Sequence, residues 1–103
     1  MGLIGKMTLK DFGEVHFFED KYKEGDGTAI EVIEADGCPF TRLSINLIDQ
    51  SHFLDDGEFF VKNYSEHADI IGEIEASGLF EVVPNKSGQA GAFVVPVWRI
   101  KKS

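Results

Sequence analysis

Apolar and polar residues alternate along most of this chain, which is the period-two pattern of β-strands that turn one face to a core. Glycine-containing turn signals separate several of these segments, as in Asp36-Gly37. We therefore expect an antiparallel β-meander of about five to seven strands. The predicted strands are 6–12, 14–23, 28–35, 40–48, 58–62, 79–83 and 92–100.

The spacing of apolar residues changes to three and four in one later segment, which predicts one amphipathic helix at about 64–77. Ile70 and Ile74 share the core-facing arc with His67, which we expect to be hydrogen-bonded and half-buried. Gly78 supplies the left-handed residue that ends such a helix. The expected fold class is α+β, an antiparallel β-meander with this helix packed on one face.

A second arc of the predicted helix carries only small residues, Ala68, Gly72 and Ala76. Small residues at a spacing of four allow another backbone to approach a helix closely. This stripe, or the edge strand that Pro96 indicates, could join two copies of the chain. A homodimer is therefore an open alternative.

Acidic residues concentrate in the middle of the chain. Residues 49–81 hold nine acids and one base, which together equal the net charge of −8. Three of these acids fall within ~60° of each other on the predicted helix. They form either a solvated face or a docking surface for a basic protein. The predicted partner-binding residues are Asp55, Asp56, Glu58, Glu66, Asp69 and Glu73.

A polar stripe offers an alternative binding surface. Arg42, Ser44 and Asn46 alternate with apolar residues in one predicted strand and so share a face. On an antiparallel sheet such a stripe is ordinarily the wet side. It becomes a platform for a small molecule or peptide where aromatic residues such as Phe18 or Tyr22 stand beside it.

Length and composition limit the function classes. With 103 residues the chain should form a single domain, 1–103. The lone Cys38 excludes an internal disulfide and fits a reducing compartment, so we expect a cytoplasmic protein. No apolar run reaches the ~20 residues of a membrane span. The acidic net charge disfavours direct binding of nucleic acid and favours a basic partner.

Residues that could carry catalysis or bind a metal are scattered. His16, His52 and His67 have no histidine or cysteine at the spacing of a zinc site. No serine or cysteine has the setting of an activated nucleophile. We therefore expect no metal, no cofactor and no enzymatic activity.

Three segments together carry a resemblance to a known family. They are Phe40-Thr-Arg-Leu-Ser-Ile-Asn-Leu47, Phe60-Val-Lys-Asn63 before the predicted helix, and Gly88-Gln-Ala-Gly-Ala-Phe93 before the closing strand. In this order they resemble an uncharacterised family of small proteins carried by bacteria, phages and mobile elements. The resemblance spans residues 28–100. It implies an α+β fold, but it brings no known activity and no site residue.

The resemblance also implies a genomic setting in which small acidic proteins inhibit host defence. Our leading expectation is therefore a non-enzymatic protein whose acidic surface docks on a basic partner. A host defence complex that targets nucleic acid, such as a CRISPR effector with its positively charged channel, is the kind of partner expected. The chain would then be an anti-CRISPR-like inhibitor. The alternative is a module that binds a small molecule or peptide on the polar stripe.

Overall fold

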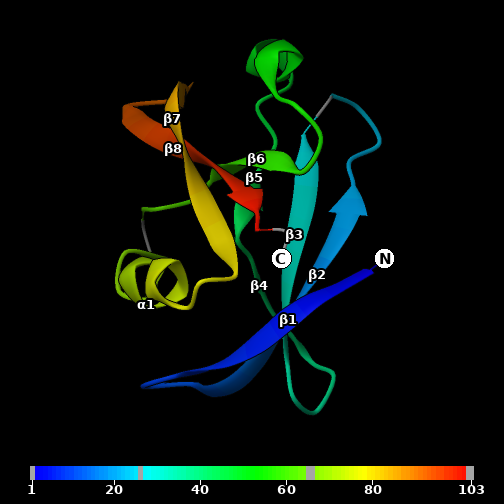
Figure 1. Ribbon diagram of the computed structural model, residues 1–103, viewed down its shortest axis with the longest axis vertical. Coiled ribbons are helices and arrows are strands. Elements are labelled where there is room, and N and C mark those ends of the chain that lie inside the picture. The colour runs from blue at the N-terminus through cyan, green and yellow to red at the C-terminus, as the bar shows by residue number, and fades with distance from the viewer. Residues whose placement is uncertain (1, 26, 65–66, 102–103) are drawn as a thin grey trace.

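The computed structural model describes residues 2–25, 27–64 and 67–101, and in these the protein is mostly antiparallel β-sheet (Figure 1). The described strands form two four-stranded sheets, ordered β1-β2-β3-β4 and β5-β6-β8-β7. The strands are β1 (Gly2–Leu9), β2 (Gly13–Lys21), β3 (Thr28–Glu34), β4 (Pro39–Arg42), β5 (Ser44–Ile45), β6 (Glu58–Val61), β7 (Phe80–Ala90) and β8 (Phe93–Ile100). The described helical segments are a 3-10 helix, η1 (Ile48–Phe53), and the α-helix α1 (Ile71–Ala76).

One residue joins the two sheets. Leu43 lies between β4 and β5, and its N–H donates to the carbonyl of Ile30 at 2.9 Å. Its own carbonyl accepts the N–H of Lys62 at 2.8 Å. Because Ile30 belongs to β3 and Lys62 follows β6, the chain passes from one sheet to the other with its backbone groups satisfied. On the opposite side, the described residues show no ladder between β1 and β7.

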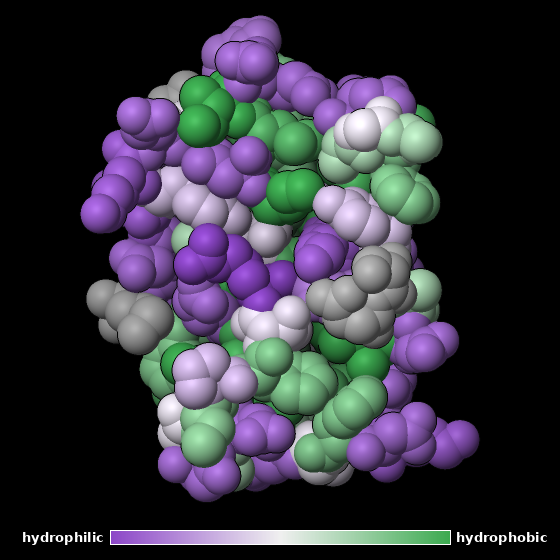
Figure 2. Space-filling view, turned by 180° about the vertical axis from the view of Figure 1, so that it is seen from behind, coloured by the Kyte–Doolittle hydropathy of each residue, from purple (hydrophilic) through white to green (hydrophobic). Residues whose placement is uncertain are grey.

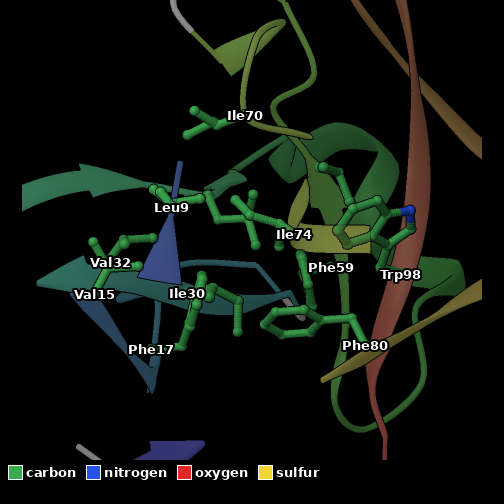
Figure 3. Close-up of a cluster of buried hydrophobic side chains, with 12 residues drawn as sticks. Leu9, Val15, Phe17, Ile30, Val32, Phe59, Ile70, Ile74, Phe80 and Trp98 are labelled. Carbon is green, nitrogen blue, oxygen red and sulfur yellow. The ribbon is translucent and has the colours of Figure 1, made fainter. Parts of the chain in front are cut away.

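Aromatic rings from both sheets meet in the core (Figure 3). Phe80 of β7 lies edge-to-face against Phe17 of β2 and Phe59 of β6, with ring centroids 5.6 and 5.5 Å apart. Trp98 of β8 lies beside Phe80 at 6.0 Å and is only 2% exposed. Such pairs add about 0.5–1.5 kcal/mol each beyond the burial of area. These ring contacts therefore fix how the two sheets face each other.

Strand β6 is buried on both faces. Phe59 faces the main core, whereas Phe60 points the other way, as alternation in a strand requires. Phe53 of η1 covers Phe60, with ring centroids 5.7 Å apart. This explains why β6 carries a continuous apolar run. The second cluster consists of Leu54, Phe60, Val83, Val95 and Val97.

The predicted α+β class is wrong, because the helix expected at 64–77 is reduced to the six residues of α1. Before α1 the backbone makes tight turns, in which the N–H of Ile70 donates to the carbonyl of His67 at 3.1 Å. The His67 ring bonds the carbonyl of Lys62 at 2.9 Å and the hydroxyl of Thr41 at 2.6 Å. The bond to Thr41 spans 26 residues and ties the segment to β4, so a regular α-helix begins only after it.

Two strand predictions are also corrected. The strand predicted at 79–83 continues as β7 to Ala90, because pairing with β8 resumes at Ser87 after a bulge. Asn85 in this bulge takes a φ of 68°, which bends the strand. The strand predicted at 40–48 is divided at Leu43 into β4 and β5, which belong to different sheets, and β5 ends at Ile45 before η1. The described chain thus has eight strands in two sheets, where the pattern predicted a meander of about five to seven.

The small-residue stripe does not lie on one helix, because Ala68 precedes α1. Gly72 and Ala76 are exposed, and a Cβ added at Gly72 would meet no atom within 4 Å. The stripe therefore packs on no other described segment of this chain, and the homodimer stays a prediction. Neither helical segment in the described ranges has the length and apolarity that a membrane crossing needs.

Replacing Gly88 by alanine should destabilise the protein. An added Cβ would lie 2.6 Å from the ring of Phe60 and 2.9 Å from the side chain of Leu47. Both neighbours pack in the second cluster and have little room to move. Gly88→Ala should therefore lower the free energy of unfolding by about 1–3 kcal/mol, measured by urea denaturation.

Gly72→Ala is the matched control for this prediction. The same substitution falls in open space within α1, where alanine is the better helix former. It should raise the free energy of unfolding by about 0.5–1 kcal/mol. A Gly88→Ala protein that gains stability in the same way would contradict the close packing at Gly88.

Candidate functional site

The inward-facing row of β2 changes from apolar to charged along the strand. Val15 and Phe17 are fully buried, whereas Glu19, the next residue on that face, is exposed. Glu19 lies opposite Gly2 of β1 and Ile30 of β3. Along β2 the core therefore ends at Phe17, although Ile30 opposite Glu19 is still buried.

This end of the molecule holds a cleft of about 570 Å³ between the two sheets. One wall comes from β1, β2 and β3, and the other from the turn before β6 and the end of β8. Three carboxylates and one ammonium group belong to the described residues that line it. We call it the acidic cleft, and its lining is Gly2, Glu19, Asp20, Lys21, Thr28, Asp56, Gly57 and Ile100.

A buried ion pair fixes the turn that carries Asp56. The Glu58 side chain is 5% exposed, and its carboxylate accepts the ammonium of Lys86 at 2.6 Å and the N–H of Asp55 at 3.0 Å. Lys86 also donates to the carbonyl of Phe53 at 2.9 Å and to the Asp55 carboxylate at 3.2 Å. The hydrogen bond to Glu58 raises the pKa of Lys86. The turn is thus tied to β7 from two sides.

The structure separates the three acids predicted before the helix. Asp56 lines the acidic cleft, and its role in partner binding stays a prediction. Asp55 and Glu58 instead pair with Lys86, and Glu58 is buried at 4% exposure. A partner could therefore reach Asp56 and Asp55, whose side chain is 80% exposed, but not the Glu58 carboxylate.

The three acids predicted on the helix do not form a helical ridge. Asp69 is exposed in the turn that precedes α1. Glu73 lies in α1, and its carboxylate accepts the N–H of Lys10 at 2.8 Å. Glu66 lies outside the described residues. Docking through these acids stays a prediction, but α1 does not align them.

Sequence reasoning missed Glu19, Asp20 and Lys21. The signal was present, because the buried row of β2 continues from Phe17 to Glu19 and Lys21 at a spacing of two. A strand whose core-facing row becomes charged marks the place where the core stops. That reasoning would have placed these residues at an open end of the sheet.

The polar stripe lies at a second pocket, of about 280 Å³, to which Arg42, Ser44 and Asn46 all contribute. Tyr22 lines it too, so an aromatic residue does stand beside the stripe. Ser44 is only 3% exposed, which the alternation did not predict. Figure 2 views the molecule from behind, the side on which β4 lies, and hydrophilic side chains gather across the middle of this face.

The other candidate residues have structural explanations. The hydrogen bonding predicted for His67 is confirmed, and the ring is buried at 1% exposure rather than half-buried. Glu34, Asp36 and Cys38 bring their ligand atoms within 4.8 Å in the β3–β4 turn. The Asp36 carboxylate accepts the N–H of Cys38, and it raises the pKa of that exposed thiol. This trio shapes a turn and gives no argument for a metal.

Comparisons of the chain with protein-family models, with curated proteins and with solved structures find no match. The assignment of function therefore rests on the chemistry of the acidic cleft and of the pocket at the polar stripe.

Glu58→Gln should lower the free energy of unfolding by about 1–3 kcal/mol, because a buried acceptor of two hydrogen bonds loses its charge. Urea denaturation measures the loss. Glu81→Gln is the control, since Glu81 pairs with Arg99 at 2.7 Å in an exposed position and should cost less than about 0.5 kcal/mol. Equal losses in both variants would show that the buried Glu58 pair stabilises the protein no more than the exposed Glu81 pair does.

The raised pKa of Lys86 predicts how stability depends on pH. A folded-state pKa above the ordinary 10.5 means that the pair contributes fully below pH 10.5. The contribution is lost as the pH rises through the higher folded-state value. Unfolding curves should therefore show the wild type losing stability above pH 10.5 faster than Lys86→Gln. Parallel pH profiles for the two proteins would contradict this.

Proposed function

We propose that this chain is a small non-enzymatic binding protein that docks the acidic cleft on a basic partner. The observation that carries the proposal is the pair Glu19 and Asp56, which bring carboxylates from β2 and from the turn before β6 to one cleft. Both side chains are exposed, so a partner can reach them without unfolding any element. The proposal moves the docking surface from the predicted helix to the open end of the sheets.

The chemistry of the cleft suits a lysine or arginine side chain. Carboxylates accept charge-assisted hydrogen bonds, and those to arginine can be bidentate. Lys21 is the cation in the lining, and it is its backbone N–H, not its ammonium group, that donates to the Asp20 carboxylate at 2.8 Å. A cleft of about 570 Å³ has room for one such side chain and part of its backbone. The net charge of −8 would also speed association with a basic surface.

Proteins that bind nucleic acid form the partner class with the densest basic surfaces, because phosphates are bound by lysine and arginine. The charged channel of a nucleic-acid-targeting defence complex belongs to this class. A protein that covers such a channel would act by competing with the nucleic acid. Inhibition of this kind needs a charged surface and no catalytic group.

Charge reversal in the cleft should remove this binding. The double variant Glu19→Lys with Asp56→Lys should bind a lysine- and arginine-rich peptide at least ~10-fold more weakly than the wild type. Fluorescence anisotropy at several salt concentrations measures the affinity. A pull-down from host lysate with both proteins then identifies partners that the variant loses, and added DNA should release them.

The control is the double variant Asp11→Lys with Glu75→Lys, which makes the same charge change at exposed positions outside the cleft. It should keep most of the affinity for the peptide and for any captured partner. An equal loss in both double variants would show a general charge effect and refute docking at the cleft.

A further inference from the structure

We propose that the pocket formed with β4 and β5 binds a small ligand through an oxyanion, which is a phosphoryl or carboxylate group. This site is independent of the acidic cleft and shares no lining residue with it. We call it the β4–β5 pocket. Its lining is Tyr22, Thr41, Arg42, Ser44, Ile45, Asn46, Lys62 and Tyr64.

Arg42 presents unused donors to this pocket. Its Nε and Nη2 both donate to the same oxygen of Glu31, each at 2.6 Å, across the β3–β4 ladder. A guanidinium group has five N–H donors, so three remain beyond this pair. Arg42 also lies 5.6 Å over the ring of Tyr22, and its side chain is 55% exposed. The ion pair and the ring thus hold the guanidinium in place without using all of its donors.

The hydroxyls of Tyr22 and Ser44 leave one more donor. They lie 2.6 Å apart, and Ser44 Oγ also accepts the N–H of Ile30 at 2.9 Å. Ser44 is buried, and among the described residues Tyr22 Oη is the acceptor in reach of its proton. Ser44 therefore donates to Tyr22, which frees the Tyr22 O–H. Burial raises the pKa of Tyr22, so this donor keeps its proton at neutral pH.

Asn46 turns its donor side, not its acceptor side, toward accessible space. Its Nδ2 donates to the carbonyl of Glu24 at 3.2 Å, which fixes the orientation of the amide. Its Oδ1 is buried and has no hydrogen-bond partner in the described structure. That oxygen lies against Gly25 and cannot meet a ligand in the pocket. Asn46 can therefore offer a second N–H but no acceptor.

Thr41 adds an acceptor to the pocket, because its hydroxyl proton goes to His67, but the N–H and O–H donors of Arg42, Tyr22 and Asn46 outnumber it. The Nδ1 of His67 lies 2.9 Å from the carbonyl of Lys62, and because a carbonyl only accepts, Nδ1 carries the proton. In the neutral ring Nε2 then accepts the hydroxyl proton of Thr41 at 2.6 Å. The side chains that face the pocket thus offer mainly N–H and O–H donors, which an oxyanion satisfies best.

The pocket is sized for one such group. Its volume of about 280 Å³ lies at the lower limit for small-molecule sites. The rings of Tyr22 and Tyr64 border it and can contact the apolar part of a ligand. Glu31 neutralises the charge of Arg42 in part, so specificity should come from directed hydrogen bonds rather than from net charge.

A titration of isotope-labelled protein with inorganic phosphate, followed by NMR, tests the proposal. The amide signals of Arg42, Ser44 and Asn46 and the Arg42 Nε–H signal should shift saturably, with roughly millimolar affinity. Acetate forms a second arm, so a stronger response to phosphate or to acetate tells a phosphoryl ligand from a carboxylate ligand. Sodium chloride at equal ionic strength is the blank. Shifts that sodium chloride reproduces would overturn the proposal.

Arg42→Gln should weaken phosphate or acetate binding about tenfold or more. The matched control is Arg99→Gln, because Arg99 pairs with Glu81 across β7 and β8 at 2.7 Å with 52% exposure, in the same kind of ladder pair. It should leave the affinity unchanged. Tyr22→Phe removes the free hydroxyl but keeps the ring, and should weaken binding several-fold. Melting curves verify that each variant folds. Equal effects of Arg42→Gln and Arg99→Gln, or full affinity in folded Tyr22→Phe, would refute the site.

Discussion

The two backbone hydrogen bonds of Leu43 are the constraint on which the rest of the structure depends. Through them one residue, itself fully buried, belongs to both sheets. They close the molecule on the side of β4 and β5 and bring the rings of Phe17 and Phe59 to opposite walls of one core. The same connection places Ser44 beside Tyr22, so the β4–β5 pocket lies at the joint between the sheets. Among the described residues no ladder joins β1 to β7, so the far end between β2 and β6 can stay open as a cleft.

In this acidic protein a few basic side chains determine which carboxylates are paired and which stay exposed. Lys86 reaches across the second sheet to Glu58 and Asp55, so it is used to hold a turn and not to neutralise the cleft. Arg42 forms an ion pair with Glu31 that does not use all of its N–H donors. The carboxylates of Glu19 and Asp56 are thereby left exposed at one end of the molecule. Placement of the bases, more than the number of acids, decides which carboxylates stay exposed.

Local sequence patterns predicted the features that local interactions determine, such as the limits of most strands. Strands β2, β3, β6 and β8 end within a residue or two of their predicted limits, because alternation and turn glycines are properties of short segments. The helix prediction was wrong because His67 bonds Thr41, 26 residues earlier in the chain, and no local periodicity shows such a link. Likewise, the pairing of Lys86 with Glu58 spans 28 residues, so the sequence could not show that this acid was already used. The polar stripe was predicted on one strand, whereas its residues lie in β4, in β5 and just after β5; all three line one pocket, and ligand binding there stays a prediction.

The row of β2 that ends in Glu19 gives the strongest reason to look for function at the cleft. An apolar residue at this position, opposite the buried Ile30, would extend the core and add hydrophobic stability. The chain instead places a charged residue there, and Lys21 and Thr28 face each other beyond it. A charged residue in a row where packing favours apolar residues is expected at a site that binds a ligand or a partner. The apolar residues of α1, in contrast, are explained by the core that they fill. Packing therefore accounts for α1, whereas it does not account for Glu19.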